Sequence, residues 1–207
     1  MTAPAPLAPA TSLDVSALPS LRLGRRSLLW WGNVGMITIE STMFALLIAA
    51  YFYLRSDVVH WPPPTVSVPG LGLPLLNLAL IVVSALPMHI SDKRAEEHDR
   101  AGVILWLGIG ILFGLGIIVV RGVILRTLDV KWNQNAYGSI VWTILALHAS
   151  HLFASTVESI GLWLYFVLGR VEEKHFLYAR VDTLYWYFVV AAWLPLFAVL
   201  YLSPRLM

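Results

Sequence analysis

The chain has 207 residues, of which 58% are hydrophobic and only 13% are charged, about half the charged fraction of an ordinary soluble domain. It has no cysteine, which excludes disulfides and any metal or haem site held by thiolates. The net charge of +2 comes from cations that lie between apolar segments, so they report membrane topology and not a nucleic-acid-binding surface. We therefore expect an all-α, polytopic membrane protein.

Residues 1–26 precede the first apolar segment and are rich in Ala, Pro, Ser and Thr. No continuous apolar run follows a basic start, so the pattern does not predict a cleaved signal peptide. We expect a mobile cytoplasmic tail over 1–26, and a five-helix transmembrane bundle over 27–207.

The first predicted span covers about 30–54 and is long enough to cross a bilayer, which takes roughly 20 residues. Trp30 and Trp31 at one end and Arg55 at the other are typical anchors at the membrane interface. Glu40 lies between them, about 15 Å from Trp30. A carboxyl group at that depth costs about 2.5–3.5 kcal/mol to insert, so we expect it to be protonated, paired or functional.

The second and third spans are predicted over about 73–90 and 101–120. The connection before them contains Trp61, followed by three prolines that exclude a helix, and Trp61 is a further interface anchor. Asn77 lies inside the second span. We expect its amide to bond to its own backbone or to a neighbouring helix.

The fourth span, about 136–168, carries four polar side chains spaced 3, 4 and 3 residues apart, which places them on one stripe of a helix. Two histidines and a carboxylate could hold a metal, and a histidine pair could ligate haem. Haem held between helices needs histidines from different helices, however, so we favour a buried hydrogen-bond network or lipid site. The stripe consists of His148, His151, Ser155 and Glu158.

The fifth span is predicted over about 184–202, with Trp186 as an interface anchor near its start. With five spans, nine cations fall on the side of the N-terminus and five on the other side. The excess of positive charge predicts a cytoplasmic N-terminus and an outer C-terminus, in a bacterial inner membrane.

Several segments, in this order, resemble the cytochrome c oxidase subunit III family of the haem–copper oxidases. They are Glu40 with Phe44 at +4 and AAYFYLR from +9 to +15, Trp61-Pro-Pro-Pro, Ala136-Tyr-Gly-Ser, His148-x-x-His151, and the closing Tyr185-Trp-Tyr-Phe-Val. The resemblance extends from about Trp31 to Tyr201.

The chain departs from the family pattern at four places. Leu145-Ala146 replaces a Thr-Gly pair, and Arg121 lies where family members tend to carry Gln and Glu. Tyr187 and Val190 replace the His and Asp of the closing motif, so any role of that pair is absent here.

The resemblance implies a subunit that binds no haem or copper itself, while the partner subunits I and II hold both. Such a chain packs on the catalytic subunit I, binds phospholipid in a cleft, and supports proton uptake and turnover stability in a complex that reduces oxygen and translocates protons. Longer members have two more helices that form the other wall of this cleft. Here the cleft is expected to be open or completed by another subunit.

Three alternatives stay open at this point. The chain could be a subunit-III-like accessory chain of a nitric oxide reductase. For either complex, the electron donor could be cytochrome c or quinol. It could be a haem or metal protein with its own redox chemistry, using His148, His151 or His89. A transporter with Glu40 as its protonation site is less favoured, because no paired inverted repeat is present.

Glu40 and His148 both reach the middle of the membrane if the first and fourth spans run in opposite directions, since each lies about 15–16 Å from an interface. Each polar group costs free energy when it faces lipid, and a hydrogen bond between them relieves that cost. We therefore expect the two spans to be neighbours, with Glu40 facing His148 or His151. The alternative is that a protonated Glu40 bonds a carbonyl of its own helix.

Overall fold

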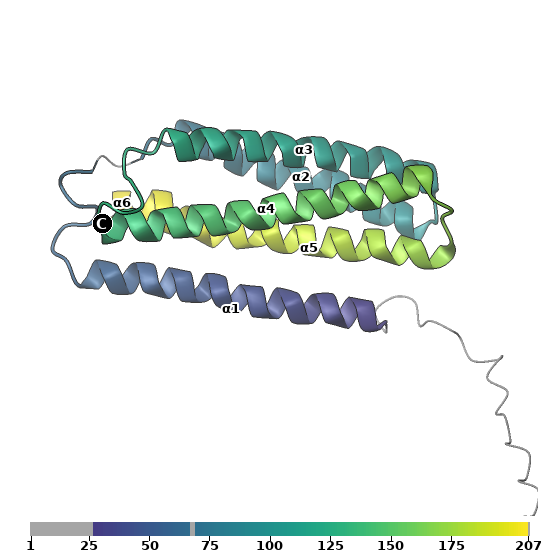
Figure 1. Ribbon diagram of the computed structural model, residues 1–207, viewed down its shortest axis with the longest axis horizontal. Helices are drawn as coiled ribbons and strands as arrows, with labels where there is room; N and C mark the ends of the chain where they lie inside the picture. The colour runs from purple at the N-terminus through teal and green to yellow at the C-terminus, as the bar shows by residue number, and fades with distance from the viewer. Residues whose placement is uncertain (1–26, 67–68, 207) are drawn as a thin grey trace, which may run out of the picture.

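The computed structural model describes residues 27–66 and 69–206, so the tail expected over 1–26 lies outside the described part. It contains five long helices, followed by a short π-helical segment and one final turn of helix (Figure 1). These elements are α1 (Leu28–Ser56), α2 (Gly72–Glu96), α3 (Arg100–Arg126), α4 (Ala136–Leu168), α5 (Glu173–Phe197), η1 (Ala198–Leu202) and α6 (Ser203–Leu206). Each of the five long helices is long and apolar enough to span a membrane, which confirms the all-α, five-span class.

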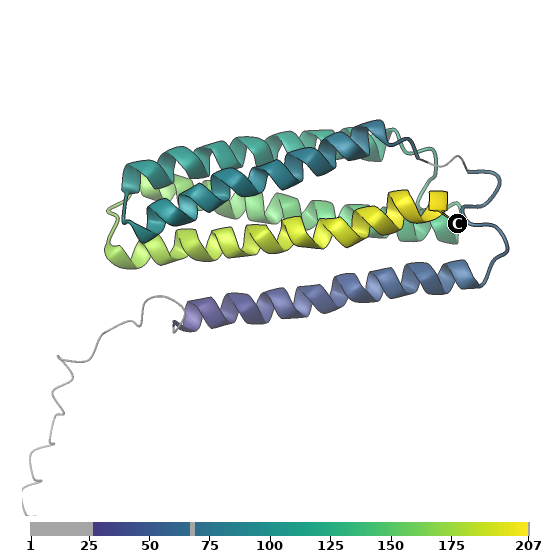
Figure 2. The same cartoon turned by 180° about the vertical axis from the view of Figure 1, so that it is seen from behind.

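The five helices run side by side in three layers, which Figures 1 and 2 show from opposite sides. Helices α2 and α3 form one outer layer, α4 and α5 form the middle, and α1 lies alone on the far side. Helix α1 packs on α4 and α5, while α2 packs on both α3 and α5. Helix α5 touches α1, α2 and α4, and α4 touches α1, α3 and α5, so these two helices form the centre of the bundle.

The helices are longer than the apolar segments that predicted them, except for α4, whose bounds match the prediction. Helix α2 continues to Glu96, and the turn before α3 is only residues 97–99. Asp99 caps α3 by accepting from the backbone N–H of Gly102. The charged segment after the second apolar run is therefore largely helical, because charged residues are good helix formers once they pass the membrane boundary.

Helix α5 begins at Glu173, eleven residues before the apolar segment that was predicted as the fifth span. A capping box starts it: the Glu172 side chain accepts from the backbone of His175, whose ring accepts in return from the backbone N–H of Glu172. Helix α5 therefore has more than two turns before the predicted apolar segment begins.

Trp186 is a correction to the predicted interface anchors. Only 2% of it is exposed, and its indole N–H donates to Ser84 Oγ at 3.0 Å in the bundle core. The early start of α5 places Trp186 about 20 Å along the helix, which is too deep for an interface. Gly114 makes room for this ring, since a Cβ there would lie 3.1 Å from it and 2.7 Å from Thr156 Oγ1.

The other predicted anchors lie towards the two ends of the bundle. Trp31 is 60% exposed and meets Trp30 edge to face at the start of α1. At the opposite end, Arg55 donates to Ser203 Oγ at 3.3 Å. Trp61 packs between the rings of Tyr51 and Tyr137, with centroid distances of 5.4 and 5.1 Å, and so ties the connecting loop to α1 and α4.

Candidate functional site

Glu40 forms a polar centre where α1 meets α4 and α5. The hydroxyl of Tyr185, on α5, donates to Glu40 Oε2 at 2.9 Å. His151 Nε2, on α4, lies 3.8 Å from the same oxygen. The Glu40 carboxyl group thus accepts from a side chain of α5 and lies beside a side chain of α4, so the expected juxtaposition of Glu40 with a histidine of the fourth span is found, with His151.

The hydrogen bonds of His151 define which of its ring nitrogens is available to Glu40. Nδ1 lies 2.7 Å from the carbonyl oxygen of Leu147, and because a carbonyl only accepts, Nδ1 carries a proton and donates. Nε2 is then the ring nitrogen that faces Glu40, and the 3.8 Å separation suits a bridging water.

This centre lies at the surface of the bundle. The side chains of Glu40 and His151 are 19% and 11% exposed, so both reach the surface of the bundle. Phe44, one turn after Glu40, is buried and packs its ring 5.0 Å from that of His151 and 6.0 Å from that of Phe188. These aromatic rings cover the side of the polar centre that is nearer the C-terminal end of α1.

His148 belongs to a different environment, although it lies only three residues from His151. It is fully buried, its Nε2 lies 3.1 Å from the Val189 carbonyl oxygen, and its ring packs 4.6 Å from Trp193. The expected contact of Glu40 is thus made with His151 and not with His148.

The predicted polar stripe of α4 does not act as one network. At 100° per residue, His148 and Ser155 lie within about 20° of each other, while His151 and Glu158 lie roughly 60–80° away, at the edge of the buried face. Ser155 is accordingly buried and bonds only the carbonyl of Leu152, at 3.4 Å. Glu158 is exposed.

Asn77 lies in a second buried polar cluster, between α2, α3 and α5. Its amide nitrogen donates to the Ile117 carbonyl at 3.1 Å, and its oxygen accepts from Arg121 Nη2 at 2.7 Å. The bond to a neighbouring helix was one of the two expected outcomes. Arg121 was expected beyond the third apolar run, among the outer cations, but it lies inside α3 and is 1% exposed, with its guanidinium 3.6 Å above the Trp193 ring.

Sequence reasoning missed Asp182, which was placed in a connecting loop. Its carboxyl group is buried and accepts from Ser159 Oγ, at 3.0 Å from both oxygens. The adjacent Val181 carbonyl accepts from Asn33 at 3.0 Å, which ties α1 to this end of α5. The signal that could have found Asp182 is its position one turn before Tyr185, on the same face of a helix that starts at Glu173.

No cluster of three or more His, Asp or Glu side chains that could hold a metal ion occurs among residues 27–66 and 69–206. Tyr187, which replaces the histidine of the family motif, interacts through its hydroxyl with His89 Nδ1 at 3.0 Å. His89 thus pairs with a phenol in the C-terminal half of α2.

Comparison with protein families gives a match to the model described as cytochrome c oxidase subunit III, over residues 24–204. The chain belongs to the cytochrome c oxidase subunit III family. As a member of this family it is an integral membrane protein and a subunit of a cytochrome c oxidase complex, and the family itself carries no redox cofactor.

Individual relatives agree with this assignment. The chain is 28% identical over 182 residues to the cytochrome c oxidase subunit 3 of Synechocystis sp., a match that covers 86% of this chain and 77% of the relative. It is 27% identical to the subunit 3 of Thermostichus vulcanus (84% and 87% covered) and 27% identical to the probable subunit 3 of Nocardia farcinica (86% and 90% covered). The similarity thus extends over most of each protein.

Proposed function

We propose that this subunit III packs against the catalytic subunit I of a respiratory oxidase in a bacterial inner membrane and has no redox role of its own. The haem and copper belong to subunits I and II. Family membership supports this role, and so do the many large apolar side chains that are exposed on the bundle. Side chains such as Ile39, Leu46 and Leu112 are each about 70% exposed in the chain alone, which suits contact with lipid and with other apolar subunits.

The polar centre at Glu40 is the single observation that carries the finer part of the proposal. Glu40, Tyr185 and His151 come from three helices and meet halfway through the bundle, at a surface that lipid can reach. Keeping polar groups near hydrocarbon costs free energy, so their presence there indicates a function. We infer that phospholipid lies against the bundle surface where α1 meets α4, with its chains near Phe44 and its neighbours.

The inner end of the bundle supports a contribution to proton uptake. Ion pairs join Arg180 to Asp92 at 3.1 Å and to Glu96 at 2.6 Å, and His98 lies 3.8 Å from Glu173. Negatively charged side chains at an aqueous surface attract protons and other cations electrostatically. A surface of this composition beside subunit I raises the local supply of protons to that subunit.

Purification through an affinity tag on the tail of this chain tests the proposed partnership. The expected result is co-purification of a haem–copper subunit I, with all haem absorption lost when the chain is separated from its partners. A chain that is isolated alone and retains a haem band would overturn the proposal in favour of the redox-protein alternative. The partner's identity also separates an oxidase from a nitric oxide reductase.

A further inference from the structure

Arg121 is a buried cation without an ion pair in the described part of the chain. It lies in the outer half of α3, five residues before the end of that helix, and is 1% exposed. Its Nη2 donates to Asn77, but Nε and Nη1 have no hydrogen-bond partner.

An arginine cannot relieve this situation by losing its proton, because the guanidinium stays charged in proteins. A buried charge without a counter-charge is strongly destabilising, and native structures satisfy buried donors with water or ions. The contact with the Trp193 ring, at 3.6 Å, recovers only part of that cost. A negative charge beside Arg121 would remove the rest of this free-energy cost.

Other unpartnered donors are gathered around the guanidinium. The indole N–H of Trp193 and the hydroxyl of Tyr201 are both buried without a partner, and Tyr201 lies near enough to Arg121 for the two groups to interact electrostatically. Two guanidinium nitrogens, an indole and a phenol are four donors. Four hydrogen-bond donors can stabilise an anion, whereas a cation would need acceptors.

His148 adds an acceptor at the inner side of this cluster. Its Nε2 donates to the Val189 carbonyl, which leaves Nδ1 as a lone pair, buried and unpartnered. That lone pair would repel an anion but would accept from a water molecule. The donors and this acceptor together fit an anion with one bridging water.

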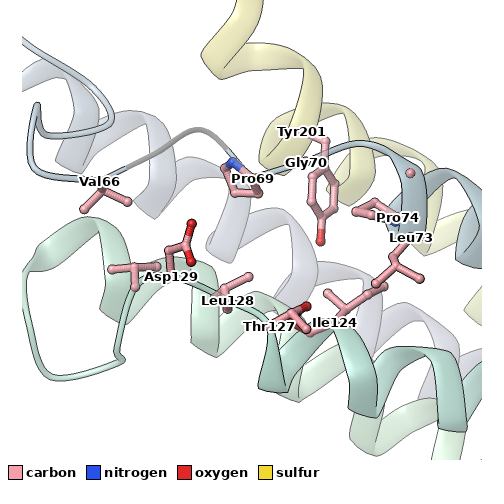
Figure 3. A pocket seen from close by; sticks show the side chains of 12 residues that line it. Val66, Pro69, Gly70, Leu73, Pro74, Ile124, Thr127, Leu128, Asp129 and Tyr201 are labelled. Carbon is pink, nitrogen blue, oxygen red and sulfur yellow. Dashed lines mark hydrogen bonds between the residues drawn. The ribbon is translucent and has the colours of Figure 1, made fainter.

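A pocket of about 170 Å³ opens at the outer end of the bundle, and Tyr201 is part of its lining (Figure 3). Its lining includes Tyr201, Ile124 and Pro74, and Figure 3 shows the Tyr201 hydroxyl pointing into it. Ile124 is one turn from Arg121, and Pro74 is one turn from Asn77. The pocket has room for several waters and a small ion.

We propose that a small monovalent inorganic anion of the chloride type binds at Arg121, entering through the outer pocket past Tyr201. Arg121, Trp193 and Tyr201 donate to it, and Asn77 holds the guanidinium in place from the other side. The bound anion neutralises the charge buried between α2, α3 and α5 and so strengthens the outer half of the bundle. The inference does not depend on the role proposed for Glu40.

Thermal unfolding in chloride and in gluconate, at constant ionic strength, tests the anion site. The full chain is used in detergent, with whatever subunits co-purify. We expect the melting temperature to rise by several degrees as chloride replaces gluconate. Arg121→Gln should abolish this rise and should be at least as stable as the wild type in gluconate, because the unpaired charge is gone. Arg126→Gln, on the exposed end of the same helix, should keep the full response.

Tyr201→Phe keeps the test informative if Arg121→Gln does not assemble. It removes one donor without removing the ring, and we expect the half-saturating chloride concentration to rise about tenfold. A wild type that melts at the same temperature in both salts would overturn the proposal. The same holds if chloride stabilises Arg121→Gln or acts on Tyr201→Phe with an unchanged midpoint.

Discussion

Tyr185 donates a hydrogen bond of 2.9 Å to Glu40, 145 residues earlier in the chain. The bond joins α5, one of the two central helices, to α1, which lies alone on one side of the bundle, and His151 of α4 lies beside it (Figure 1). Nothing in the local sequence of either residue specifies this partner. The bond is the central polar link between α1 and the rest of the bundle.

The Glu40 centre leads to a first prediction about how α1 is held. Glu40→Gln keeps a hydrogen-bond acceptor for Tyr185 and should preserve assembly, whereas Glu40→Ala leaves the Tyr185 hydroxyl without a partner and should cost about 1–3 kcal/mol. Thermal unfolding of the complex and the rate of inactivation during turnover measure the difference. Thr42→Ala is the control, because that side chain is exposed and bonds only its own helix. Equal behaviour of Gln and Ala at position 40 would contradict the inferred role of the bond.

The two histidines of α4 should differ in their contribution to stability, although neither should affect the haem. His148→Ala removes a fully buried ring and opens a cavity against Trp193, with an expected cost of about 2–4 kcal/mol. His151→Ala, at the bundle surface, should cost about 1 kcal/mol. Unfolding curves and the haem absorption of the complex are the measurements. Loss of a haem band in either variant would show that this chain ligates haem.

Gly114 should tolerate no side chain, because an added Cβ would lie 2.7 Å from Thr156 Oγ1 and 3.1 Å from the Trp186 ring. Gly114→Ala is therefore expected to push α3 away from α4 and α5 and to cost about 1–3 kcal/mol. Gly116→Ala, two residues along the same helix, meets nothing within 4 Å and should be neutral or slightly stabilising. Melting temperatures of the two variants provide the comparison, and similar losses in both would refute this account of the packing.

The topology of the chain can be tested with reporter fusions. The end of the bundle that holds the 97–99 turn carries six described cations (Lys93, Arg94, Arg100, Arg170, Lys174 and Arg180), and the opposite end carries four (Arg55, Arg126, Lys131 and Arg205). The excess predicts that a reporter in the 97–99 turn lies in the cytoplasm and one after Met207 lies outside. The reverse result would invert the membrane orientation, and the same side for both would mean that one helix does not span.

The amino-acid sequence by itself determined the features that depend on local composition. Five apolar segments predict five spans, because the bilayer thickness sets the required length and every backbone group must be satisfied within its own helix. The depth of Glu40 follows from counting residues along one helix. The motifs from Glu40 to the closing Tyr185-Trp186 indicated the family before any contact was known.

The tertiary structure decided which of these side chains meet, because a contact between helices depends on rotation and register that no single segment encodes. Trp186 was expected at an interface and lies in the core, since α5 starts eleven residues earlier than its apolar segment. Arg121 resembled a cation of the outer boundary, but its helix continues past it, and Asn77 and Trp193 enclose it. Asp182 was assigned to a loop until the helix placed it against Ser159. In each case the packing of α5 against its neighbours determined the environment of the side chain.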